Sequence, residues 1–365
     1  MRHLNWSWLL LSASLCWACG GSISAFAKDR AAAERAYAAG RYQEAAKHWQ
    51  DAASHAKSPG AARKAQHRQA MSLLRGGRWQ AARAVLLKLT SPRSSMSARA
   101  SYDLALLDLE HQQRAAGTER LRQLILTEPE SAVAAIALRR YLDLVLDEHG
   151  AEGVLATINE LLPQLSSTAL DETLRYHQAS QLAAAGRNEL ALAAYLDLAE
   201  RHPYPRGAHW DDALWHAAEL EEQRGRPQAA IAHLERLLSV RESADFMGSY
   251  ERPRYGEARF HLAELIRDAL HDPPRAREEF WRLFKRHPNS LLRDDALWEA
   301  AKLAQDQGDQ AGTCSLLRTL SQDLPDSRYV KCAPLLCAEL TERVPKDSCA
   351  PYIARSLSGN APSPQ

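Results

Sequence analysis

Four cysteines near the carboxyl end carry the clearest chemistry of this sequence. Cys314, Cys332, Cys337 and Cys349 all lie within the last 52 residues. Such a set can form two disulfides, for which sequence alone allows three connectivities, or it can bind a metal ion. Metal binding is the poorer interpretation, because no C-x-x-C pair occurs in this region and no histidine follows His287. We therefore expect two structural disulfides, no metal and no cofactor.

The spacing around a predicted turn favours one of the three connectivities. Cys314 lies about as far before the turn at 325–327 as Cys337 lies after it. On an antiparallel helix pair these two residues would face each other, which leaves Cys332 to pair with Cys349. The other two connectivities remain open at this level.

Residues of the kinds used in catalysis do not assemble into a known arrangement. His209 and His216 are seven residues apart beside acids, which matches no metal-ligand spacing with a known mechanism. The pairs at 211–212 and 294–295 are aspartates that open predicted helices, where acids interact favourably with the helix dipole. Nucleophile-elbow, zinc-protease and phosphate-loop motifs are absent from the sequence. We expect no catalytic residues and no enzyme activity.

The elements that position these residues form a repeat. Residues 210–218 and 293–301 are identical at seven of nine positions, at an offset of 83. A second pattern has a glycine, a small residue five positions later, and apolar residues four and seven positions beyond it. This pattern predicts pairs of amphipathic helices with a glycine at each turn, and such pairs must stack to bury their apolar faces. It follows the glycines Gly40, Gly77, Gly186, Gly225 and Gly308.

The pattern resembles the tetratricopeptide repeat. The resemblance implies an all-α, right-handed superhelical solenoid of antiparallel helix pairs, with about seven or eight units over residues 28–328. The region 141–162 is the most degenerate, and Gly150 is its surviving landmark. The units near Asp211, Asp294 and 325–327 are similar to those of periplasmic envelope proteins. These include the Tol-Pal-associated cell-division coordinator and the tetratricopeptide lipoprotein of the outer-membrane barrel-assembly machine.

The resemblance also implies a place for a partner. The first helix of each tetratricopeptide unit lines the concave groove, so aromatic side chains on it could form a ladder for an extended peptide or an amphipathic helix. The alternative is that these rings pack between adjacent units. The candidate rings are Tyr176, Trp215, Phe260 and Trp298. The polar residues beside them are Glu219, Glu222, Glu264 and Lys302.

The first 27 residues have the pattern of a secretory signal peptide. A basic start and an apolar middle precede Ala25-Phe26-Ala27, which fits the cleavage rule and predicts a mature start at Lys28. A periplasmic location follows, and no stretch is long enough to span a membrane after cleavage. Alternatively, Cys19 lies in a small-residue setting that resembles a lipoprotein cysteine, which would give an outer-membrane lipoprotein.

Three segments depart from the repeat. Residues 240–256 are expected to be an inserted loop, either exposing Phe246, Met247, Tyr250 and Tyr255 to a partner or packing as a connector. Residues 329–353 are expected to form a helical cap held by the disulfides. Residues 354–365, with Gly359 and two prolines, are expected to be a disordered tail.

The composition limits the function. The chain has 365 residues, 45% hydrophobic and 25% charged, with a net charge of +1. No basic excess is available for a phosphate backbone, so we expect no nucleic acid partner. We predict a non-catalytic, exported scaffold that binds a protein or peptide in the bacterial envelope. The alternative is an accessory factor of outer-membrane biogenesis, cell division or motility, associated peripherally with the outer membrane or anchored through Cys19.

Overall fold

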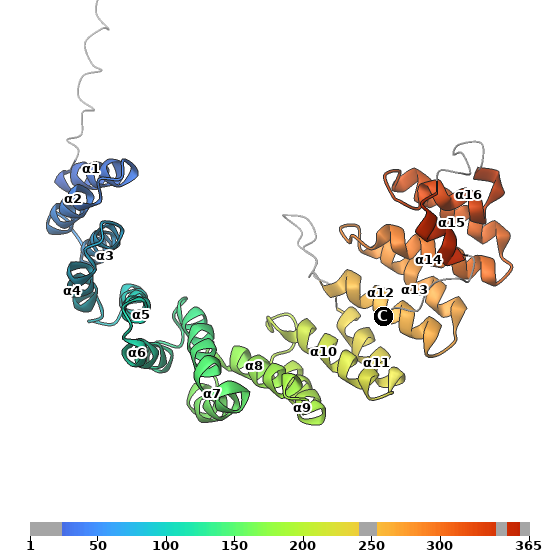
Figure 1. Ribbon diagram of the computed structural model, residues 1–365, viewed down its shortest axis with the longest axis horizontal. Coiled ribbons are helices and arrows are strands. Elements are labelled where there is room, and N and C mark those ends of the chain that lie inside the picture. The colour runs from blue at the N-terminus through green and yellow to red at the C-terminus, as the bar shows by residue number, and fades with distance from the viewer. Residues whose placement is uncertain (1–23, 241–253, 341–348, 358–365) are drawn as a thin grey trace, which may run out of the picture. The chain divides into compact units, whose positions relative to one another are not determined.

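The computed structural model describes residues 24–240, 254–340 and 349–357, and every regular element within these ranges is a helix (Figure 1). The expected all-α class is confirmed. The chain divides into two compact units, one up to Asp171 and one from Glu172. Among the described helices, none is both long enough and apolar enough to cross a membrane.

The first unit is a series of helices in which each packs on its neighbours along the chain. α7 is two helices, because Gly150 interrupts it with a φ of 67°. The degenerate region of the sequence is therefore a helix pair whose turn has been shortened to one residue. The helices are α1 (Ala25–Ala38), α2 (Tyr42–Ser54), α3 (Pro59–Arg75), α4 (Trp79–Leu89), α5 (Ser95–Glu110), α6 (Arg114–Thr127) and α7 (Ala134–Leu165).

The second unit has four helix pairs and two apolar clusters, one spanning α8 to α14 and one joining α13, α14 and α15 to the segment that follows them. With α7 counted as a pair, helices α1 to α15 form eight pairs, at the upper end of the expected number. The helices are α8 (Asp171–Ala184), α9 (Asn188–Arg201), α10 (Trp210–Gln223), α11 (Pro227–Leu238), α12 (Arg254–Asp268), α13 (Pro273–Arg286), α14 (Arg293–Asp306) and α15 (Gln310–Asp323).

The turn between α10 and α11 shows why the glycine pattern makes these pairs. Gly225 has a φ of 69°, which a residue with a side chain rarely adopts. The backbone N–H of Arg226 then reaches back to the carbonyl of Glu221 at 2.9 Å and closes α10. Ala218 and Ala230, at most 1% exposed, leave room for the two helices to pack closely.

A short cap follows α15. It contains the 3₁₀ turn η1 (Val330–Cys332), α16 (Ala333–Leu336), the 3₁₀ turn η2 (Ala338–Leu340) and α17 (Pro351–Leu357). Disulfides join Cys314 to Cys337 and Cys332 to Cys349, which is the connectivity favoured by the turn spacing. The first bond ties the cap to α15, and the second ties its two halves together.

Two expected boundaries differ from the structure. α12 begins at Arg254, and Tyr255 and Gly256 are buried, so residues 254–256 belong to this helix and not to an exposed loop. Residues 354–357 belong to α17, because Ile353 is buried against the cap and the Cys349 disulfide holds the start of this segment. The expectation of disorder from residue 354 is therefore wrong for these four residues. Phe246, Met247, Tyr250 and residues 358–365 lie outside the described residues.

The first described helix overlaps the predicted cleavage motif. α1 starts at Ala25, and the Ser24 hydroxyl accepts a hydrogen bond from the Ala27 N–H. The predicted cleavage motif thus occupies the first turn of α1. Cys19 and the rest of residues 1–23 lie outside the described residues.

Candidate functional site

The four predicted aromatic residues lie on the first helices of successive pairs, but one of them is buried. Trp298, on α14, is 2% exposed. Its ring stacks on Tyr329 of the cap, with ring centroids 4.8 Å apart and an interplanar angle of 13°. Trp298 therefore packs between α14 and the cap, and the prediction that it faces a partner is wrong.

The other three rings are partly buried and contact neighbouring helices. Tyr176 stacks on His209 at 4.4 Å, and Trp215 lies 5.6 Å from the ring of His261 on α12. Phe260 meets Phe280 edge to face at 5.1 Å. Packing between helices accounts for most of the surface of these rings, so they do not form a continuous exposed ladder.

Alanine substitutions test this difference. Trp298→Ala is expected to lower the free energy of unfolding of the last pair and the cap by about 3–5 kcal/mol, because it leaves a large cavity in the core. Trp215→Ala should lower the free energy of unfolding by less, because part of the Trp215 ring already faces solvent. Thermal denaturation would show which of the two variants is less stable. Equal losses of stability would contradict the conclusion that Trp298 is more deeply buried than Trp215.

The polar residues one and two turns beyond these rings line two depressions. The first, of about 450 Å³, lies between α10 and α12, and the second, of about 310 Å³, lies between α12 and α14. Both are lined by Glu264. We call the two depressions together the acidic groove, after its carboxylates: Glu222, Glu264, Asp268, Glu299 and Asp306.

Two cations in the acidic groove already form ion pairs with its carboxylates. The Arg267 guanidinium contacts Asp268 at 2.7 Å and Glu299 at 2.8 Å. The Lys302 ammonium contacts the same Glu299 at 3.0 Å. Arg267 lowers the pKa of Asp268, so this carboxylate stays ionised well below neutral pH. Five carboxylates against two cations leave the groove negative at neutral pH.

His261 lies between two of the groove carboxylates. Its Nε2 is 2.8 Å from Glu222, and its Nδ1 is 3.7 Å from Glu264. Glu264 and then Glu222 raise the pKa of His261 by stabilising its protonated form, against the opposing effect of burial. The groove therefore contains a group that can add a positive charge when the pH falls.

Sequence reasoning identified some of these residues but missed others. Glu222, Glu264 and Lys302 were expected beside the rings and do line the groove, whereas Glu219 instead pairs with His216 at 2.7 Å. Asp268, Glu299 and Asp306 were missed. Asp268 and Asp306 each lie eight residues after a predicted aromatic position, so the helical period carried a usable signal for these two.

A family comparison identifies one unit of the fold. Residues 212–240, which cover most of α10 and all of α11, match the family model described as tetratricopeptide repeat. This unit is a tetratricopeptide repeat. Most of the other helix pairs repeat its turn, with a glycine of positive φ at Gly40, Gly77, Gly150, Gly186 and Gly308. In α5–α6 and α12–α13 the positive-φ residue is instead Gln112 or His271. The chain is therefore built from tetratricopeptide-like units.

Several solved structures of tetratricopeptide proteins are similar to the chain at low identity. PilF of Pseudomonas aeruginosa is 18% identical, covering 68% of this chain and 99% of its own, with a TM-score of 0.38. A tetratricopeptide repeat protein of Parabacteroides merdae is 14% identical, covering 76% and 98%, with a TM-score of 0.33. The C-terminal part of one from Cytophaga hutchinsonii is 11% identical, covering 73% and 98%, with a TM-score of 0.43. No curated protein matches the chain. The likeness to Tol-Pal and barrel-assembly proteins stays a prediction.

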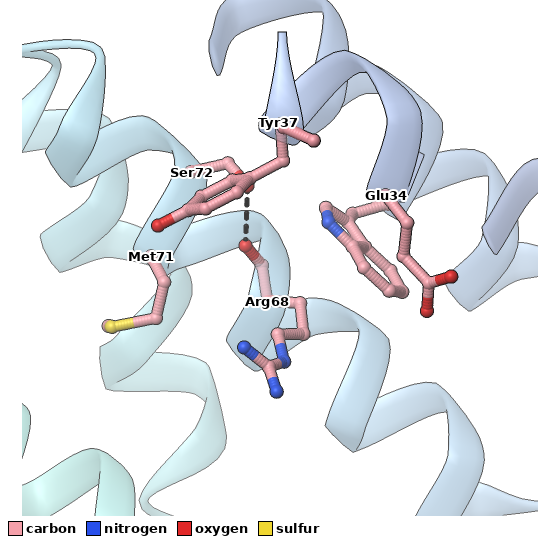
Figure 2. A pocket seen from close by; sticks show the side chains of 7 residues that line it. Glu34, Tyr37, Arg68, Met71 and Ser72 are labelled. Carbon is pink, nitrogen blue, oxygen red and sulfur yellow. Dashed lines mark hydrogen bonds between the residues drawn. The ribbon is translucent and has the colours of Figure 1, made fainter. Parts of the chain in front are cut away.

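A further depression lies between the first two tetratricopeptide-like pairs. It has a volume of about 220 Å³ and is lined by residues of α1, α2 and α3. Figure 2 shows Glu34 and Tyr37, which come from α1, and Arg68, Met71 and Ser72, which come from α3. The Ser72 hydroxyl donates to the Arg68 carbonyl at 2.9 Å, so its hydrogen-bonding capacity is used within α3. No sequence motif pointed to this place.

One group of potential metal ligands occurs among the described residues. It consists of Cys314, Cys337 and Glu339. Both sulfur atoms belong to the same disulfide and offer no thiolate to an ion. The disulfide accounts for this cluster without a metal.

Proposed function

We propose that this protein is an exported scaffold of the bacterial envelope that captures a basic segment of a partner protein in the acidic groove. The tetratricopeptide fold is that of a protein-interaction scaffold. The observation that carries the proposal is the pair of adjoining depressions, which share Glu264 and hold five carboxylates against two cations.

The charge of the surrounding helices supports a basic partner. At the partly buried and exposed positions of α10, α12 and α14 there are ten Asp or Glu residues and four Lys or Arg residues. The whole chain, by contrast, has a net charge of only +1. Complementary charge speeds encounter and rejects acidic competitors, because like charges placed together cost several kcal/mol.

Partly exposed rings at the edge of the groove add a second attraction. Trp215 already accepts one cation over its face, since the Arg254 guanidinium lies 5.3 Å from its centroid. Phe260 lines the depression between α12 and α14. A Lys or Arg side chain of a partner would find both carboxylates and ring faces there.

The envelope location rests on two features of the sequence. The signal pattern of residues 1–27 predicts export, and disulfides persist in oxidising compartments such as the periplasm. Mass measurement of the protein purified from envelopes tests it. A start at Lys28 supports a periplasmic scaffold. A diacylated Cys19 would support the alternative of an outer-membrane lipoprotein acting in envelope biogenesis, division or motility.

Binding of labelled peptides to the purified chain tests the groove. We expect a Lys-rich peptide to bind and Glu264→Lys to weaken it at least about tenfold, because the substitution removes one attraction and adds a repulsion. The matched control is Glu278→Lys, an exposed carboxylate on α13 that does not line the groove. Equal weakening in both variants would point to general electrostatics and would contradict the groove.

The pH dependence of the same binding gives an independent readout. Protonation of His261 adds a positive charge to the groove, so affinity for the Lys-rich peptide should fall as the pH drops from 8 towards 6. Because the pKa of His261 is raised above its ordinary value of about 6.5, the fall should begin above that pH. A His261→Gln variant should lose this part of the pH response.

A further inference from the structure

Although the chain is almost neutral overall, it contains a long segment without acidic residues. Between Asp51 and Asp103 there is no Asp or Glu. The same stretch contains ten bases: Lys57, Arg63, Lys64, Arg68, Arg75, Arg78, Arg83, Lys88, Arg93 and Arg99. This segment forms α3, α4 and the start of α5 in the first unit. The overall balance of charges therefore says nothing about the local field here.

Most of these bases are available to a partner. Arg83 and Arg99 pair with Asp108 and Asp103, and Arg63 donates to three backbone carbonyls, of Leu89, Ser91 and Pro92. The other seven are exposed, and none makes an ion pair with a described residue: Lys57, Lys64, Arg68, Arg75, Arg78, Lys88 and Arg93.

Three of the seven lie on one face of α3 together with a methionine. Lys64, Arg68, Met71 and Arg75 are spaced four, three and four residues apart, which places them in a single stripe of about 16 Å along the helix. α3 itself contains no acid. We call these four residues the basic stripe.

The basic stripe passes beside the depression of the first unit. Arg68 and Met71 line it from α3, and Tyr37 lines it from α1 (Figure 2). Trp49 lines it from α2. Trp49 is 7% exposed and Tyr37 is 37% exposed, so one ring is anchored in the core and the other is open to a ligand. Glu34, the acid at this depression, is 3.6 Å from Arg30 and is partly neutralised by it.

We infer that the depression and the basic stripe form a second recognition site, which takes an acidic peptide segment that carries an aromatic or long aliphatic side chain. The apolar side chain enters between Tyr37, Trp49 and Met71. Flanking carboxylates of the peptide lie along Lys64, Arg68 and Arg75. This site has the opposite charge preference to the acidic groove and does not depend on it.

The apolar part of the site distinguishes this ligand from other anions. A nucleic acid or an anionic membrane would use the seven free bases without needing the depression, because both are bound through phosphates. A volume of about 220 Å³ beside two aromatic rings and a thioether suits one large side chain of a peptide. Phosphate-bearing surfaces are therefore outcomes of the test and not part of the proposal.

The test compares labelled peptides by fluorescence anisotropy on the full chain. We expect a peptide with a central Phe flanked by Asp and Glu to bind, and its Phe→Ser and charge-reversed versions to bind at least about tenfold more weakly. Arg68→Gln should weaken the Phe peptide by about tenfold. The matched control is Lys88→Gln, an exposed and unpaired base on α4 outside the depression, which should change affinity by less than about twofold.

Two results would overturn the inference. The first is an equal loss of peptide affinity in Arg68→Gln and Lys88→Gln, or an affinity that does not change when Phe in the peptide is replaced by Ser. Either would show that the peptide is attracted by charge in general and does not use the depression. Binding of an oligonucleotide or of phosphatidylglycerol vesicles with no binding of the acidic Phe peptide would assign the bases to phosphates instead. Because Arg68 and Lys88 are exposed, neither variant is expected to disturb folding, which circular dichroism would verify.

Discussion

Replacing Glu279 with alanine is expected to lower the free energy of unfolding by about 3–5 kcal/mol, because it leaves a buried charge without its partner. The Arg259 guanidinium is 7% exposed and donates to Glu279 at 2.6 Å and to Nε2 of His287 at 2.8 Å. Burial lowers the pKa of Arg259, and Glu279 is the group that opposes this effect. Thermal denaturation combined with hydrogen exchange of α12 and α13 would measure the loss.

The neighbouring acid provides the control. Glu278 is exposed and pairs with Arg282 on the surface of α13. Glu278→Ala should therefore cost no more than about 0.5 kcal/mol. A Glu279→Gln variant keeps a hydrogen-bond acceptor, so its stability should lie between those of Glu278→Ala and Glu279→Ala. Similar stability of Glu278→Ala and Glu279→Ala would show that Arg259 does not need its buried partner.

Removing the disulfide between Cys332 and Cys349 is expected to destabilise the cap by about 2–4 kcal/mol. The bond closes a loop with a sequence separation of 17 and joins η1 to the residues just before α17. α17 has seven residues and buries only Ile353, so it has little apolar packing of its own to keep it in place. A Cys332→Ser, Cys349→Ser double variant should show fast hydrogen exchange at residues 351–357.

The same experiment contains its own control. In a repeat protein each unit contacts only its neighbours, so exchange in α10 and α11 should stay unchanged. Replacing Cys314 and Cys337 by serine should also speed hydrogen exchange in α15, because Cys314 lies on that helix. Fast exchange in α10 after either change would contradict the local role of these bonds.

Much of the fold was predictable because its turns depend on local chemistry. Gly225 needs a positive φ that only glycine adopts readily, and Ala218 with Ala230 marks the close approach of the two helices. The same glycine turn recurs at Gly40, Gly77, Gly186 and Gly308, so the sequence repeats it. The turns of α5–α6 and α12–α13 carry no such signal, because Gln112 and His271 take the positive φ there. The pair within α7 was hard to recognise because Gly150 is its whole turn.

Tertiary contacts could not be predicted in the same way. Trp298 is buried because Tyr329, which comes from the cap beyond the repeats, stacks on it. The residues 354–357 are helical because Ile353 and a disulfide hold this segment against the cap. The expected ladder identified the right helices, and Phe260 does line the groove. Most of the charged residues of the groove, however, lie one or two turns further along these helices.

Glu264 lines both depressions of the acidic groove. A positive charge that settles beside it in one depression weakens the attraction that remains for the other. Two lysines close together in a partner would compete for this single carboxylate. Lysines spaced widely enough to reach Glu222 at one end and Asp306 at the other would each find a carboxylate of their own. The distance between positive charges in the bound segment, and not only their number, would then select the partner.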